Sequence, residues 1–162
     1  MTGTTPRVVV AGLGSEYRRD DGVGPLIAAR AVDEAGLGSV IGPLVDPLDL
    51  LGEWDEADLA VVVDAVRSGV APGTLTLVEL TGAYGGVDQA GPRSATSTHG
   101  IGLAGVLRLA RAIDRAPARV VVVGIEGEDF GRGTGLSPAV EAAVPAAVCR
   151  VVDVIKEGRA CA

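Results

Sequence analysis

One stretch near the amino terminus, VVVAGLGSEYRRDDGVGP at residues 8–25, constrains the fold of this chain most. It begins as a continuous aliphatic run, which is typical of a strand covered on both faces of a sheet. Gly12 and Gly14 end that run, and a helical pattern of apolar residues begins near Asp21. This order of strand, turn and helix predicts the first unit of an α/β domain.

The other apolar segments continue the alternation of strands and helices. We expect further strands at Val40–Val45, Leu59–Asp64, Thr74–Leu80 and Arg119–Ile125, and further helices at Pro47–Trp54, Gly100–Asp114 and Leu136–Ile155. Too few residues separate the third and fourth strands for a parallel return, so the fourth strand should be antiparallel. The prediction is a single domain over residues 1–162, an α/β/α sandwich of three layers around a mostly parallel five-stranded sheet.

Composition fits a soluble domain with an aliphatic core. Of the 162 residues, 48% are hydrophobic but only 2% are aromatic, so Val, Leu, Ile and Ala must fill the core, and Cys149 should belong to it. A formal net charge of −7 argues against nucleic-acid binding, which needs a basic face. No apolar run is long enough for a membrane helix, and no leader sequence is evident, so we expect a cytoplasmic protein.

Polar residues at predicted helix starts have an ordinary structural interpretation. Asp46 and Ser137 each precede a proline, as N-cap residues often do. Asp20 and Asp21 could likewise cap the first helix and complement its dipole. A helix needs only one such cap, however, so one of these two carboxylates is left for another role.

Asp21, Asp64 and His99 are expected to lie at the same edge of the sheet, where the parallel strands end. Asp64 ends the strongest predicted strand, although an ion pair with Arg67 is an alternative role for it. His99, the only histidine, stands at a predicted helix start, where the helix dipole favours the neutral, metal-binding imidazole. Two carboxylates and one imidazole suit a borderline divalent ion such as nickel or zinc and leave coordination positions open.

Other familiar sites fit the sequence less well. A dinucleotide-binding turn needs a third glycine where this chain has Tyr17, and two carboxylates near the helix start would repel phosphates. A single histidine excludes an H-E-x-x-H zinc site, and neither a G-x-S-x-G elbow nor a well-placed cysteine–histidine pair is present. If the chain is a protease, it lacks a familiar nucleophile.

The chain resembles the nickel–iron hydrogenase maturation endopeptidases over nearly its whole length. Four motifs in a specific order carry the resemblance: GLGSEYRRDDGVGP at 12–25, VVVDAVRSGVAPGT at 61–74, STHGIGLAGVL at 97–107 and GIEGEDFGRGTGLSPAV at 124–140. One region departs from the pattern, because many members carry an Asp-Gly-Gly-Thr-like turn where this chain has Gly42 to Pro47. Substrate choice could differ if that turn shapes the cleft.

The resemblance implies a function and a set of site residues. Such enzymes remove a C-terminal peptide from the large-subunit precursor of the hydrogenase after nickel has been inserted. The matching positions, Asp21, Asp64 and His99, would be both the catalytic and the metal-contacting residues, with nickel supplied by the substrate. Two alternatives remain open: a non-catalytic chaperone that checks nickel loading, and a nucleotide-binding α/β module.

Overall fold

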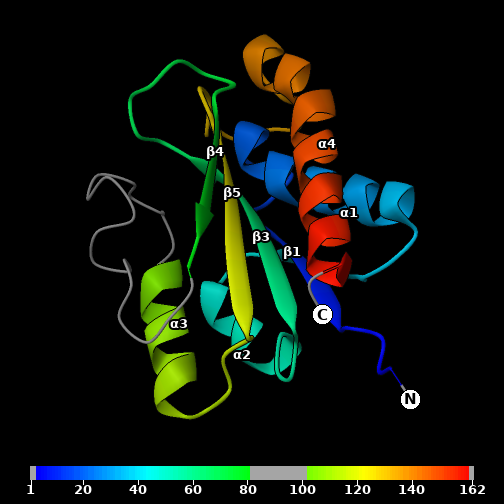
Figure 1. Ribbon diagram of the computed structural model, residues 1–162. Helices are drawn as coiled ribbons and strands as arrows, with labels where there is room; N and C mark the ends of the chain where they lie inside the picture. The colour runs from blue at the N-terminus through cyan, green and yellow to red at the C-terminus, as the bar shows by residue number, and fades with distance from the viewer. Residues whose placement is uncertain (1–2, 81–101, 161–162) are drawn as a thin grey trace.

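Five strands form one sheet in the order β2-β1-β3-β5-β4 in the computed structural model, which describes residues 3–80 and 102–160 (Figure 1). The strands are β1 (Val8–Leu13), β2 (Ser39–Leu44), β3 (Leu59–Val66), β4 (Leu75–Glu79) and β5 (Arg119–Glu126). All neighbouring strands are parallel except β4, which runs antiparallel to β5. The prediction of a mostly parallel sheet with one antiparallel strand is confirmed.

Helices lie on both faces of this sheet. The helical segments are the 3₁₀ turn η1 (Arg19–Gly22), α1 (Val23–Ala35), the 3₁₀ turn η2 (Pro47–Asp49), α2 (Leu50–Glu53), α3 (Leu103–Ala112) and α4 (Pro138–Ala160). Side chains of α1 and α4 share one core cluster with β1, β3 and β5, and side chains of α2 and α3 share the other with the same strands (Figure 1). The predicted three-layer α/β/α sandwich is therefore confirmed.

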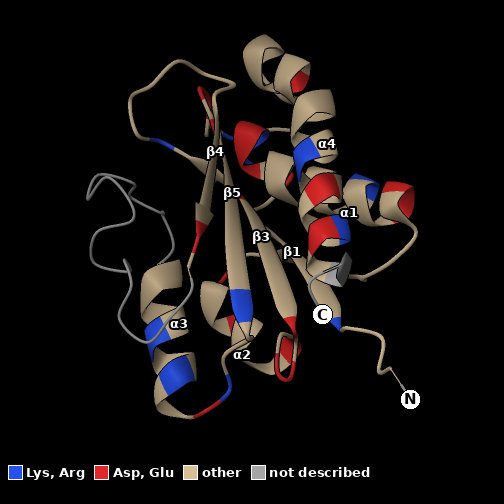
Figure 2. Cartoon of the chain, in the orientation of Figure 1, with Lys and Arg blue, Asp and Glu red and all other residues tan. Residues whose placement is uncertain are grey.

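The alternation of side chains along β3 accounts for the two cores. Val61 and Val63 point to the face covered by α1 and α4, whereas Ala60 and Val62 point to the face covered by α2 and α3. Burial on both faces explains why this strand reads as a continuous aliphatic run. Charged residues accordingly lie near the strand ends and on the helices (Figure 2).

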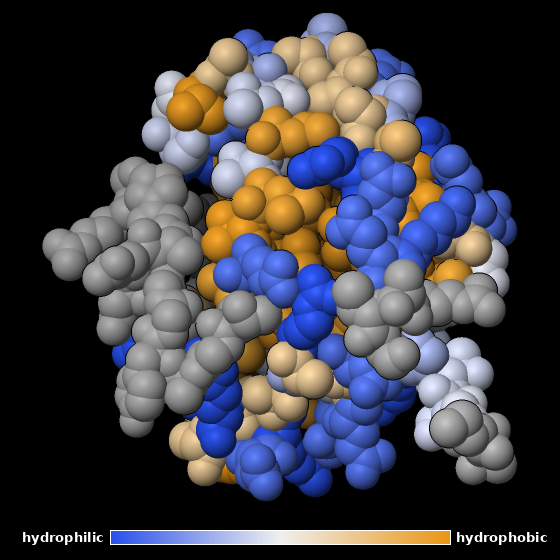
Figure 3. Space-filling view, in the orientation of Figure 1, coloured by the Kyte–Doolittle hydropathy of each residue, from blue (hydrophilic) through white to orange (hydrophobic). Residues whose placement is uncertain are grey.

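The outer strand β4 has one face without a helix over it among the described residues. Leu77 pairs with Val123, whose side chain lies in the core beneath α1 and α4, yet Leu77 itself is 39% exposed. Apolar surface accordingly gathers beside α4 in the space-filling view (Figure 3). None of the helices in the described part of the chain is long and apolar enough to cross a membrane.

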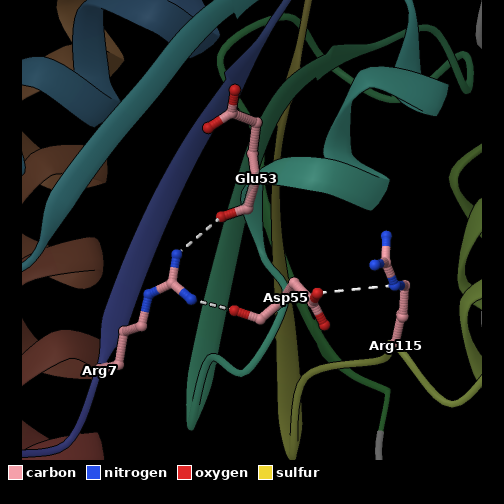
Figure 4. Close-up of polar contacts among 4 residues, drawn as sticks. All are labelled: Arg7, Glu53, Asp55 and Arg115. Carbon is pink, nitrogen blue, oxygen red and sulfur yellow. Dashed lines mark hydrogen bonds and ion pairs between the residues drawn. The ribbon is translucent and has the colours of Figure 1, made fainter.

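Surface polar contacts hold the amino ends of the strands together. The Arg7 guanidinium donates to the backbone carbonyls of Glu53 and Asp55, and the Asp55 carboxylate lies 3.6 Å from the Arg115 guanidinium (Figure 4). Both side chains of that ion pair are partly exposed, so it adds at most about 1 kcal/mol to stability. The opposite edge, where β1, β3 and β5 end, is different; we call it the carboxyl edge.

Candidate active site at the carboxyl edge of the sheet

Glycines bring the start of α1 unusually close to the ends of β1 and β3. A Cβ on Gly24 would lie 2.5 Å from the Val63 carbonyl oxygen and 2.6 Å from that of Leu13. Gly14 has φ +118°, and a Cβ there would lie 3.0 Å from the Asp21 carboxyl carbon. The glycine turn thus has a packing role, and it brings η1 with its two aspartates against the carboxyl edge.

Asp21 is buried in η1, with 2% of its surface exposed. Its Oδ2 accepts a hydrogen bond of 2.8 Å from the backbone N–H of Ser15, which orients the carboxylate across the turn. Its charge acts on Asp64, which lies at the end of β3. The structure therefore brings two of the three predicted site residues together.

Asp64 is a buried carboxyl group with few partners in the described part of the chain. It is 9% exposed, and its Oδ1 has no hydrogen-bond partner among the residues that the structure describes. Burial, and then the nearby charge of Asp21, raise the pKa of Asp64 to about 8, against the opposing effect of the Ala65 backbone N–H. Without a bound cation, Asp64 is therefore mostly protonated at pH 7. The alternative ion pair with Arg67 is absent among the described residues.

Asp20, by contrast, is fully buried, and both of its carboxylate oxygens accept hydrogen bonds. Its carboxylate accepts hydrogen bonds from the backbone N–H groups of Glu128, Asp129 and Ser137, and from the Ser137 hydroxyl, at 2.7–2.9 Å. Burial acts to raise the pKa of Asp20, but these hydrogen bonds outweigh it and hold the pKa below its ordinary value. The interpretation that one of Asp20 and Asp21 caps α1 is wrong, because the N-cap residue is Gly22 and no side chain makes the capping hydrogen bond. The Asp20 carboxylate instead ties η1 to the loop before α4.

Ser137 takes part in this contact instead of capping α4 with its hydroxyl group. The helix begins at Pro138, as expected, and the Ser137 carbonyl accepts from the Glu141 N–H at 2.9 Å. Its hydroxyl donates to Asp20. The Asp46 prediction is confirmed, since its Oδ1 accepts from the Leu48 N–H at 2.9 Å.

Glu126 is a buried carboxylate that the sequence interpretation missed. It ends β5, is 2% exposed, and accepts from the Ser68 N–H and hydroxyl at 2.8 Å and from the Gly69 N–H at 3.0 Å. It therefore holds the segment that follows Asp64 against the end of β5. A signal for it is present in the sequence, because Glu126 comes after a buried aliphatic run just as Asp64 does.

Two of the three predicted metal ligands can be examined at this edge of the sheet. Within residues 3–80 and 102–160, no three His, Cys, Asp or Glu side chains are grouped so as to hold a metal ion. His99, the third predicted ligand, lies outside the described residues. The unpaired buried oxygen of Asp64 beside Asp21 is what a site for a cation would leave in the absence of its ion. The site assignment as a whole stays a prediction.

Comparison with known proteins places this geometry in a family. The hydrogenase maturation protease family (HycI) matches residues 45–154 of this chain. The chain belongs to the hydrogenase maturation protease family. This membership makes it a peptidase, as the resemblance in its motifs predicted.

Individual relatives are similar over most of their length. The chain is 28% identical to the hydrogenase 2 maturation protease of Escherichia coli, with 93% of this chain and 92% of that protein covered. It is 32% identical to the hydrogenase expression/formation protein HupM of Azotobacter chroococcum, over 81% of this chain and 64% of that protein.

Solved structures extend the similarity to the fold. The maturating endopeptidase HybD from E. coli superposes with a TM-score of 0.74 at 25% identity, with 93% of each chain covered. The [NiFe] hydrogenase maturation protease HybD from Thermococcus kodakarensis gives 0.69 at 25% identity, with 91% of this chain and 98% of that chain covered.

Proposed function

We propose that this protein is the endopeptidase that removes the C-terminal peptide of a nickel–iron hydrogenase large-subunit precursor after nickel insertion. Asp21, Asp64 and His99 together bind the nickel ion that the precursor carries, so only loaded precursor is cut. Family membership supports the peptidase activity. The single observation that favours recognition of a cation is the buried oxygen of Asp64, next to Asp21, which no residue in the described part of the chain pairs.

Each carboxyl group has a distinct task in this proposal. Ser15 holds Asp21 in one orientation, so that its carboxylate is ready before the precursor docks. Asp64 is mostly protonated in the free protein and releases its proton when a cation approaches, because the positive charge lowers its pKa. Binding of loaded precursor is thereby coupled to the ionisation of a buried group, which an unloaded precursor cannot bring about.

The framework around them keeps the two groups in place. Asp20 and Glu126 each use a carboxylate to hold a neighbouring loop through backbone N–H groups. The nickel ion, when present, would supply a Lewis acid beside the scissile peptide bond. The protein then contributes by positioning the precursor, since docking on the ion brings the bond to the carboxyl edge.

A processing assay tests the proposal directly. Purified protein is mixed with nickel-loaded and nickel-free precursor, and the product is followed by mass spectrometry. We expect only the loaded precursor to lose its tail. Equal cleavage of both forms would reject nickel-gated recognition, and binding without cleavage would favour a non-catalytic chaperone that checks nickel loading.

A substitution of His99 tests the third proposed ligand. His99→Ala should abolish processing while the melting temperature stays close to that of the wild type, because a residue that binds an ion brought by the substrate contributes little to the stability of the free protein. If His99→Ala unfolded the protein instead, a structural role for this histidine would be favoured. Thermal-shift measurements with Ni²⁺, NAD and ATP separate the nucleotide-binding alternative, since a ligand that binds the native state raises the melting temperature.

A further inference from the structure

Arg67 follows β3, three residues beyond Asp64, and its guanidinium lies on an aromatic ring. The guanidinium carbon is 4.6 Å from the centre of the Phe130 ring, a cation–π distance. Arg67 is exposed, whereas Phe130 is partly buried against the core beneath α1 and α4. The cation is thus presented to solvent at the carboxyl edge, supported by a ring that is itself packed.

Contacts to neighbouring backbone hold both the Phe130 ring and the segment that follows Arg67. A Cβ on Gly127 would lie 2.5 Å from Cζ of Phe130, so the ring packs directly on the backbone of that glycine. On the other side, Glu126 binds the backbone of Ser68 and Gly69, the two residues that follow Arg67. The backbone on either side of the stack is therefore held in place, and the arginine loses less conformational freedom when it binds a ligand.

Carboxylates close to Arg67 in the structure are directed elsewhere. Glu126, which contacts the next residue, uses both of its oxygens on Ser68 and Gly69. Asp129, next to Phe130, accepts a hydrogen bond from the Gly131 N–H at 2.8 Å. Among the described residues, Arg67 has no ion pair, and its guanidinium contacts the face of the Phe130 ring. Its charge is therefore available to a ligand.

The geometry of the stack indicates which ligand fits. The N–H donors of the Arg67 guanidinium make no hydrogen bond or ion pair within the described residues, so they are open to a ligand beside the ring. Two parallel N–H groups match a carboxylate, with which they make paired, charge-assisted hydrogen bonds. A backbone carbonyl would use one of these donors and leave the charge uncompensated.

We propose that Arg67 is a specificity-determining residue that binds a carboxylate of the C-terminal tail of the precursor. This inference rests on the proposed endopeptidase function, because it takes the tail to pass Arg67 on its way out of the site. The carboxylate is either an acidic side chain of the tail or its terminal group. Both have the same chemistry, and the experiment separates them.

The test compares Arg67→Ala and Arg67→Lys with the wild type on nickel-loaded precursor. Arg115→Ala is the matched control, because Arg115 is also a partly exposed arginine but pairs with Asp55 at the opposite edge (Figure 4). We expect Arg67→Ala to raise KM about tenfold and to leave kcat within about twofold of the wild type. Arg67→Lys keeps the positive charge but loses the paired N–H donors of the guanidinium, so its KM should lie between those of the wild type and Arg67→Ala. Arg115→Ala should match the wild type.

Three precursors identify the carboxylate: one with the natural tail, one with the tail's Asp and Glu changed to Asn and Gln, and one extended by a neutral Gly-Ser segment. Loss of the Arg67 effect with the neutralised tail assigns an acidic side chain. Loss of the effect with the extended tail assigns the terminal carboxylate. An equal rise in KM for Arg67→Ala on all three precursors, or no rise on any, overturns the proposal.

A binding measurement keeps this inference separable from the proposed function. The dissociation constant of each fluorescently labelled, nickel-loaded precursor is measured by anisotropy alongside cleavage. If the wild-type protein binds precursor without cutting it, the endopeptidase proposal fails, and the comparison of Arg67→Ala with the wild type still decides whether Arg67 binds the tail. If the wild type cuts precursor and Arg67→Ala equals it in both KM and affinity, the function stands and the role of Arg67 is rejected.

Discussion

Asp20 and Asp64 are two carboxyl groups at the same edge of one sheet, and they have opposite surroundings. Asp20 is completely buried and accepts four hydrogen bonds, and its pKa lies below the ordinary value. Asp64 is slightly less buried, has one oxygen without a partner among the residues that the structure describes, and has its pKa raised to about 8. Burial alone therefore does not decide the state of a carboxyl group; the hydrogen-bond donors aimed at it and the neighbouring charge, here that of Asp21 beside Asp64, decide it as well.

This difference separates a structural role from a functional one. An Asp20 carboxylate with four donors stabilises the fold and has little capacity left for a ligand. An Asp64 carboxyl group with an unpaired oxygen is unfavourable in the free protein, and such groups are concentrated at functional sites. The following experiments separate the two roles, starting with the largest expected effect.

Substitution Asp64→Asn should remove processing while preserving the fold. We expect the cleavage rate of nickel-loaded precursor to fall at least about 100-fold, since an amide is a far weaker ligand for a cation than a carboxylate. Initial rates followed by mass spectrometry measure this effect. Asp33→Asn, on the exposed face of α1, is the matched control and should cut at the wild-type rate. A fully active Asp64→Asn variant would contradict the functional role.

Substitution Asp20→Ala should act mainly on stability. It leaves three part-buried backbone N–H groups and a hydroxyl without their acceptor, at a cost of about 4 kcal/mol in the free energy of unfolding. Urea denaturation measures this free energy, with Asp33→Ala as the control for loss of an exposed aspartate. A loss below about 1 kcal/mol would mean that water replaces the carboxylate easily, and Asp20 would then not be the anchor of this loop.

Sequence patterns predicted the framework well because aliphatic periodicity is a local signal. The strand at Leu59, the antiparallel β4 and the Asp46 cap depend on neighbouring residues only, and all three are confirmed. Cys149 was wrongly placed in the core: it is exposed on α4. Alanine and valine occupy both faces of this helix, so the sequence does not reveal which face is buried.

The candidate site was only partly predictable, for a different reason. Asp21 and Asp64 could be placed at one edge because parallel strands end there. The partners of Asp20 and Glu126 could not be predicted, because they come from loops up to 117 residues away in the chain. Hydrogen bonds to loop N–H groups leave no periodic trace in the sequence.

The stability of the metal-free protein should also depend on pH through Asp64. The folded-state pKa of about 8 exceeds the ordinary pKa of 3.8, so between these limits the folded protein holds a proton that the unfolded chain has released. The contribution of Asp64 to stability is complete below about pH 4 and is lost as the pH rises towards 8. Wild type should lose up to about 1.4 kcal/mol per pH unit relative to Asp64→Asn.

Urea denaturation of both proteins between about pH 5 and 8, with a chelator present, measures this difference. Asp20 does not confuse the result: its pKa is lowered, so its contribution is present above its unfolded pKa and is lost only as the pH falls through the folded one. If the two proteins showed parallel curves over this range, the carboxyl group of Asp64 would have to be ionised throughout, with a partner that the described residues do not supply.

The smallest effect should come from Ser137→Ala, which removes one of the four donors to Asp20. Three backbone N–H groups remain on the carboxylate, so we expect a loss of about 1.5 kcal/mol, the lower end for a hydrogen bond to a charged group. Urea denaturation of Ser137→Ala, Asp20→Ala and the double variant gives the coupling between the two side chains. Additive losses would mean that the hydroxyl stabilises the protein independently of Asp20. A coupling energy close to the full effect of Ser137→Ala would mean that the hydroxyl stabilises the protein only through Asp20. The Asp20 carboxylate would then be the group that links η1 to the start of α4.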